Sequence, residues 1–252
     1  MAQRNYGYVR RSSWGGGLPP GVKWLLISNV AIFILYFFTA RFTGSGFFSH
    51  FALVPGMVVH SLAVWQLVTY MFLHDPGGVG HILFNMLALW MFGADLERDW
   101  GTDRFLRYYF LCGTGAGLCV ILAAMLFGGM GVPTIGASGA IYGVLLAFGV
   151  LYPDRIILMS FLFPIKAKYF VMIMGAIAFL QSFSRGTGVS DIAHLGGMIF
   201  GFVYLRSKIM KGRDPLRTLS AWYRQWKIER NRKKFQVYMR KQNGPPPDRW
   251  VN

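Results

Sequence analysis

The stretch YYFLCGTGAGLCVILAAMLFGGMGVPTIGASGAIYGVLLAFGVLYP, residues 108–153, contains no Asp, Glu, Lys or Arg. It is too long for one membrane-crossing helix, because about 20 apolar residues cross the hydrocarbon core of a bilayer. A segment rich in glycine and proline, residues 128–133, interrupts it, and these residue types punctuate helices. We therefore expect two membrane-spanning helices here, at Tyr108–Phe127 and Gly136–Tyr152.

The rest of the chain has a similar character. Of its 252 residues, 54% are apolar and only 14% are charged, a balance typical of an integral membrane protein. Four further apolar runs predict spans, so we expect an all-α, polytopic bundle of six transmembrane helices. These runs are Trp24–Ala40, Pro76–Ala94, Tyr169–Ser184 and Val189–Leu205. The apolar segment Ile156–Ile165 is too short to cross, and we expect it to continue the fourth span along the interface.

The basic residues predict the orientation of the spans, because Lys and Arg concentrate in cytoplasmic flanks. With the N-terminus inside, all but two of the 26 basic residues, Arg41 and Arg185, fall on the cytoplasmic side. We therefore expect both termini to be cytoplasmic, and no cleavable signal peptide is evident. The expected parts are an N-terminal segment (1–23), a six-span core (24–208) and a basic tail (209–252).

The basic tail accounts for most of the net charge of +16. Apolar residues between Leu216 and Trp226 recur at helical spacing, which predicts a basic amphipathic helix on the inner leaflet. Anionic lipid headgroups attract Lys and Arg near the membrane surface, so we expect them as partners of the tail. Nucleic-acid binding is the weaker alternative, and we do not expect it.

The cysteines and histidines do not predict a metal site or a disulfide. Cys112 and Cys119 would lie about two turns apart on one face of a helix, too far to bridge. No Cys/His cluster has the spacing of zinc ligands, so we expect no metal site.

Four polar residues lie at a similar depth in three of the expected spans. His81 and Asn85 are near the outer start of the second span, and Ser138 is near that of the fourth. His194 is a few residues into the sixth. A lone serine or histidine in a span is usually a packing or hydrogen-bonding residue. Polar groups in spans are costly, however, and their shared depth favours a functional site.

Ser138 and His194 are the expected catalytic pair, because a serine becomes a nucleophile when a neighbouring base takes its proton. Small residues at four-residue spacing let two helix backbones approach closely, and they flank both positions. They are Gly139 and Gly143 in the fourth span, and Gly197 and Gly201 in the sixth. Asp191 is the one carboxylate near this depth, so we expect a Ser–His dyad and not a triad.

Attack on a peptide carbonyl creates an oxyanion, which needs hydrogen-bond donors already in place. The backbone N–H of Ser138 begins a helix and has no helical acceptor. His81 and Asn85 share one helical face and could add side-chain donors. The ring of Tyr142, four residues after Ser138, could hold the His194 imidazole by stacking.

At these residues the sequence resembles the rhomboid proteases, over residues 24–208. The family's Gly-x-Ser-Gly motif matches Gly136-Ala137-Ser138-Gly139, and its His-x-x-x-Asn motif matches His81 and Asn85. Its Ala-His followed by spaced glycines matches Ala193-His194 with Gly197 and Gly201. Its stacking tyrosine matches Tyr142. Leu96-Glu97-Arg98 also resembles a family pattern, with a structural role. One departure is Trp65-Gln66 in the first outer loop, where many members have Trp-Arg.

The resemblance implies a serine endopeptidase that cleaves transmembrane segments of membrane proteins near the outer face, without metal or cofactor. It implies Ser138 and His194 as the dyad and His81, Asn85 and the Ser138 backbone as the oxyanion site. The supporting residues would be Gly136, Gly139, Tyr142 and Gly197. The bare core with its basic tail suggests a bacterial inner membrane.

Two alternatives stay open. A rhomboid-like protein without activity would be a membrane binding module, but such relatives typically lack the serine or the histidine, and both are present here. A six-span transporter would need polar residues through the whole membrane, whereas the inner halves of these spans are almost wholly apolar.

Overall fold

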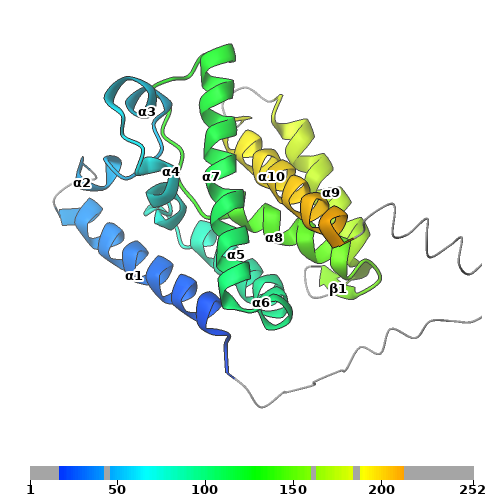
Figure 1. Ribbon diagram of the computed structural model, residues 1–252. Helices are drawn as coiled ribbons and strands as arrows, with labels where there is room; N and C mark the ends of the chain where they lie inside the picture. Colours follow the sequence, from blue (N-terminus) through cyan, green and yellow to red (C-terminus); the bar gives the residue numbers. More distant parts are fainter. Residues whose placement is uncertain (1–16, 43–45, 160–162, 184–187, 213–252) are drawn as a thin grey trace, which may run out of the picture. The chain divides into compact units, whose positions relative to one another are not determined.

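The computed structural model describes residues 17–42, 46–159, 163–183 and 188–212, and it is mostly helical (Figure 1). Residues 1–16 of the predicted N-terminal segment and residues 213–252 of the predicted basic tail lie outside the described residues. All contacts given below lie within the compact unit that ends at Tyr204.

Helices occur at all six positions where apolar runs predicted spans (Figure 1). At the second position, α5 (Gly80–Ala88), the π-helical turn η2 (Leu89–Gly93) and α6 (Ala94–Trp100) follow one another without a break. The other five positions are occupied by α1 (Pro20–Phe42), α7 (Thr102–Phe127), α8 (Ser138–Leu151), α9 (Ala167–Gln181) and α10 (Gly188–Gly212). Among the described residues, two helices, α1 and α7, are long and apolar enough to cross a membrane by those criteria alone. The helices α8 and α9 are apolar but shorter. The count of six spans therefore stays a prediction.

The expectation that Ile156–Ile165 continues the fourth span is wrong. The segment contains an antiparallel hairpin of β1 (Ile156–Met159) and β2 (Phe163–Lys166), in which Ile156 pairs with Lys166. The helix α8 ends at Leu151, and Pro153 follows two residues later. Proline disfavours a helical conformation in the residue before it, so the chain leaves the helix at this point and forms a hairpin.

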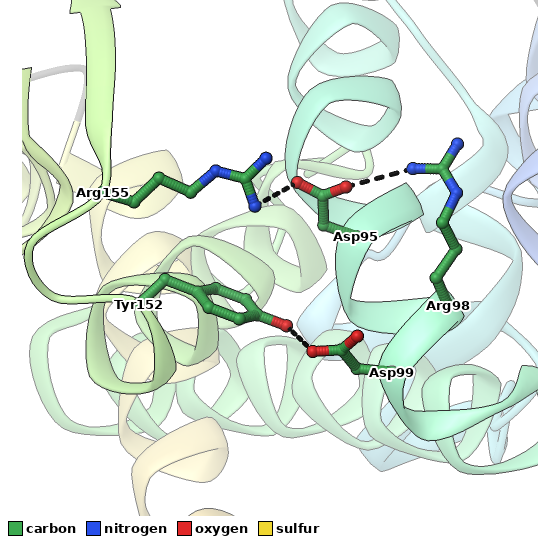
Figure 2. Close-up of polar contacts among 5 residues, drawn as sticks. All are labelled: Asp95, Arg98, Asp99, Tyr152 and Arg155. Carbon is green, nitrogen blue, oxygen red and sulfur yellow. Dashed lines mark hydrogen bonds and ion pairs between the residues drawn. The ribbon is translucent and has the colours of Figure 1, made fainter. Parts of the chain in front are cut away.

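Polar contacts hold the base of this hairpin to α6 (Figure 2). Arg155 forms an ion pair with Asp95 at 2.7 Å, and Asp95 also binds Arg98 at 3.0 Å. The Tyr152 hydroxyl donates a hydrogen bond to Asp99. Because these groups are partly exposed, the contacts fix where the chain turns more than they stabilise the fold.

Glu97 joins the start of α1 to the end of α6. Its carboxylate is buried and accepts hydrogen bonds from the backbone N–H groups of Gly21 and Val22, each at 2.7 Å. The Thr102 hydroxyl donates a third bond, also at 2.7 Å. The first N–H groups of a helix have no partner within it and carry partial positive charge, so a carboxylate suits this position. Glu97 thus has the structural role expected of its motif.

The loop between α1 and α5 contains four short helical segments, and the Gln66 side chain bonds to two separate parts of it. The segments are α2 (Gly46–Ser49), α3 (Pro55–Ser61), α4 (Gln66–Thr69) and the 3-10 turn η1 (Tyr70–Phe72). Gln66 is fully buried. Its side chain accepts a bond from the Val54 N–H at 3.0 Å and donates one to the His50 carbonyl at 3.1 Å. A neutral amide therefore organises the loop at the position where the sequence departs from the Trp-Arg pair of the proteins it resembles.

The segment before α8 is fixed to the same loop. Leu53 and Thr134 exchange two backbone hydrogen bonds, at 2.9 and 2.8 Å. The Gly136 N–H donates to the Tyr70 carbonyl at 2.9 Å. These bonds set the path of the chain immediately before Ser138, the first residue of α8.

Candidate active site

Gly136 allows His81 to approach the start of α8. Its φ is +121°, a conformation that residues with a side chain rarely adopt. A Cβ atom at this position would also lie 2.8 Å from Nε2 of His81. Both the backbone conformation and the close imidazole therefore require glycine at position 136.

Glycines also bring α8 against α10. A Cβ atom on Gly197 would lie 1.8 Å from the carbonyl oxygen of Gly139, so the two backbones are in direct contact. One turn further along, a Cβ on Gly143 would lie 3.1 Å from the Gly197 carbonyl oxygen. This packing confirms the predicted close approach of the fourth and sixth apolar segments.

The close approach places Ser138 beside His194. The serine Oγ and the histidine Nε2 are 2.9 Å apart, within hydrogen-bond distance. The Tyr142 ring stacks on the His194 ring, with centroids 4.2 Å apart and planes at 5° to each other. All three side chains are half-buried, so the imidazole has a fixed orientation and the serine is not sealed from a substrate.

His81 and Asn85 lie on α5, next to the Gly136 loop. The Asp75 N–H points at Nδ1 of His81 at 3.5 Å, and the Asn85 side chain donates to the His81 carbonyl at 2.8 Å. One of the two Asn85 amide protons is thereby used within α5. Asn85 is buried and His81 is half-buried.

A model of the rhomboid domain matches residues 61–210 of the chain. The chain belongs to the rhomboid family. It is therefore an integral membrane protein. The match contains His81, Asn85, Ser138, Tyr142 and His194.

Curated relatives come from bacteria, plants and yeast. Over 180 residues, the rhomboid is 34% identical to rhomboid protease GluP of Bacillus subtilis, covering 69% of this chain and 32% of GluP. It is 35% identical to RHOMBOID-like protein 1 of Arabidopsis thaliana, covering 60% of this chain and 36% of that one. RHOMBOID-like protein 7 of the same plant is 26% identical, over 78% of this chain and 71% of its own. The chain thus spans about a third of the length of the first two relatives.

Two features near the site of this rhomboid were not assigned from the sequence. His74, which received no role, is fully buried, and its ring centroid lies 5.0 Å from that of His81. Asp191 was not expected to belong to the catalytic group, and its Oδ1 atom lies 3.5 Å from Nδ1 of His194. The i to i+3 spacing of Asp191 and His194 was the available signal, because it places both residues on one face of a helix.

The described part of this rhomboid contains no group of three or more His, Cys, Asp or Glu side chains that could hold a metal ion. Cys112 and Cys119 are both free thiols. The absence of a metal and of a cofactor stays a prediction.

Proposed function

We propose that this rhomboid is an intramembrane serine endopeptidase with Ser138 as the nucleophile and His194 as its base. The observation that carries the proposal is the 2.9 Å contact between Ser138 Oγ and His194 Nε2. A serine and a histidine within hydrogen-bond reach, with the histidine oriented by a third group, is the arrangement that activates a serine. Here Tyr142 orients the ring by stacking.

The reaction follows from this geometry. As Ser138 Oγ bonds to the substrate carbonyl carbon, its proton passes to His194 Nε2 and the carbonyl oxygen becomes negative. The imidazolium then gives this proton to the departing amine as the peptide bond breaks, which leaves an acyl-enzyme. Water, deprotonated by the same Nε2, then hydrolyses the acyl-enzyme and restores Ser138.

The oxyanion site is proposed to consist of the Ser138 backbone N–H and the His81 side chain, with Asn85 beside them. Because the Asp75 N–H points at Nδ1 of His81, this nitrogen acts as an acceptor and the ring proton resides on Nε2. His81 Nε2 is also the atom that approaches the Gly136 backbone, two residues before Ser138. This tautomer gives His81 a donor on the side of the nucleophile.

The substrates are proposed to be transmembrane segments of other membrane proteins. The basic residues favour six spans with both termini in the cytoplasm, which puts Ser138 in the outer part of the bilayer. Anionic lipids are the proposed partner of the tail, and a bacterial inner membrane is the proposed location. The relatives come from several kinds of organism and do not decide the location.

A catalytically silent membrane binding module is the second candidate, because some rhomboid-like proteins are inactive. The contact between Ser138 and His194 favours the protease, since a binding module has no need of it. Ser138→Ala separates the two, because it removes one oxygen atom at a half-buried position and leaves the binding surface otherwise unchanged.

The test compares membranes from cells that produce the wild-type chain, Ser138→Ala or His194→Ala at equal levels. Mass spectrometry of new protein N-termini should find cleavages within or beside transmembrane segments in the wild-type sample alone. Both variants should abolish them, because the members of a catalytic pair act as a unit. Identical N-termini in all three samples would favour the binding module.

A further inference from the structure

His81 is the second residue of α5, so no earlier turn of this helix supports its ring. Long side chains in helices lean toward the N-terminus, which directs the ring toward the segment that precedes α5. Its Nε2 atom faces the Gly136 backbone, two residues before Ser138. A side chain in this position stabilises an oxyanion only if neighbouring groups hold its orientation.

Two consecutive residues of the preceding segment contact the His81 ring. The Asp75 N–H points at Nδ1 at 3.5 Å, which is long for a hydrogen bond and makes this contact weak. The His74 ring packs beside the His81 ring, with centroids 5.0 Å apart and planes tilted by 59°. Rings at this separation and tilt attract each other, so the His74 ring is the stronger constraint on His81.

We propose that His74 is a positioning residue for the reaction: its ring holds the His81 imidazole so that Nε2 stays directed at the oxyanion. This inference rests on the proposed protease function and on His81 as an oxyanion donor. It gives a role to a histidine that received none from the sequence.

The surroundings of His74 favour a role in packing. The residue is fully buried. The Phe72 carbonyl lies near it, but neither ring nitrogen makes a hydrogen bond of ordinary geometry within the part of the chain that the structure describes. Burial and, to a smaller extent, the neighbouring His81 lower the pKa of His74 to about 4, so the ring is neutral at pH 7. A neutral ring packs against His81 without charge repulsion and acts through its shape.

His74 also fills space inside the protein, and the test must separate this ordinary function from the proposed one. A purely structural role predicts that His74→Ala lowers thermal stability and that its effect on the reaction does not depend on His81. The proposed role predicts that the effect disappears when His81 is removed, because no ring is then left to hold. A double-mutant cycle measures this dependence directly.

The experiment uses the full chain in detergent and a fluorophosphonate probe, which bonds covalently to an activated serine. The rate constant of the covalent step is measured separately from probe binding for wild type, His74→Ala, His74→Phe, His81→Ala and the double variant His74→Ala/His81→Ala. Leu96→Ala is the matched control, because Leu96 is also fully buried but lies on α6, about 20 Å along the helical run from His81. Thermal unfolding of every variant is recorded in the same detergent.

His74→Ala should slow the covalent step by about tenfold or more, because a small displacement of an aligned group costs much of its effect. His74→Phe keeps a ring at this position and should restore most of the rate. The double variant should react no more slowly than His81→Ala alone. Leu96→Ala should react at the wild-type rate wherever it remains folded.

Three results would overturn the role of His74: a wild-type rate in His74→Ala, a His74→Phe chain as slow as His74→Ala, or a double variant slower than His81→Ala by the full factor seen for His74→Ala. A wild-type rate in His81→Ala would overturn the oxyanion role of His81, and the role of His74 with it, but not Ser138 as the nucleophile. A wild-type chain that does not react at Ser138 would overturn the protease proposal itself.

Discussion

Gly197 and Gly139 are in backbone contact: a Cβ atom on Gly197 would lie 1.8 Å from the Gly139 carbonyl oxygen. Gly139 follows Ser138 directly, and Gly197 is three residues after His194. The separation of the two glycines therefore sets the separation of the serine and the histidine. Because backbone atoms cannot rotate away as a side chain can, a methyl group here must push α8 and α10 apart.

Gly197→Ala should destabilise the fold by about 1–3 kcal/mol or more and abolish serine labelling by a fluorophosphonate. The matched control is Gly175→Ala on α9, whose Cβ would meet only the flexible end of Met198 at 3.2 Å. Thermal unfolding and labelling should both be close to wild type in the control. A Gly197→Ala chain with the stability and labelling of wild type would contradict the packing described here.

Gly136→Ala should impair the oxyanion site more than the fold. The positive φ costs a residue with a side chain roughly 1–2 kcal/mol, and the new methyl would displace the His81 ring. Gly131→Ala, in the same connection, is the control, because a Cβ there meets nothing within 4 Å. We expect slow cleavage and slow labelling in Gly136→Ala alone. Equal rates in both variants would argue against a role for His81.

Tyr142 should act through its ring and not through its hydroxyl group. Tyr142→Phe keeps the stacking surface at 4.2 Å from the His194 ring and should retain labelling, whereas Tyr142→Leu should lose most of it. Labelling rates at matched protein stability are the measurement. Similar rates in Phe and Leu variants would mean that stacking does not orient His194.

Glu97→Gln should lower the free energy of unfolding without changing the geometry around Ser138 and His194. The substitution replaces one acceptor oxygen by an NH₂ group that would face a backbone N–H of Gly21 or Val22. A buried donor left without an acceptor costs about 1–3 kcal/mol. Asp154→Asn is the control and should leave thermal unfolding unchanged, because its ion pairs are exposed. A Glu97→Gln chain as stable as wild type would show that the carboxylate does not hold α1.

The sequence predicted helices where long uncharged runs occur, and it placed His81, Asn85, Ser138 and His194 at one depth. Each of these inferences rests on a periodic or regularly spaced feature, such as the four-residue spacing of Gly197 and Gly201. The hairpin at β1 and β2 was missed, because a short apolar run does not distinguish a strand from a helix.

The sequence also did not predict side-chain contacts between distant segments. The hydrogen bonds of Gln66 to Val54 and His50 depend on how the loop between α1 and α5 folds back on itself, which no local pattern specifies. The position of Asp191 was visible from its helical spacing to His194, but whether its carboxylate reaches Nδ1 depends on side-chain rotamers.

The central claim is that Ser138 is an activated nucleophile, and mapping a fluorophosphonate adduct by mass spectrometry tests it most directly. The purified wild-type chain should carry the adduct on Ser138, and His194→Ala should carry none. A folded wild-type chain that still binds a transmembrane peptide but takes up no probe at Ser138 would contradict the claim.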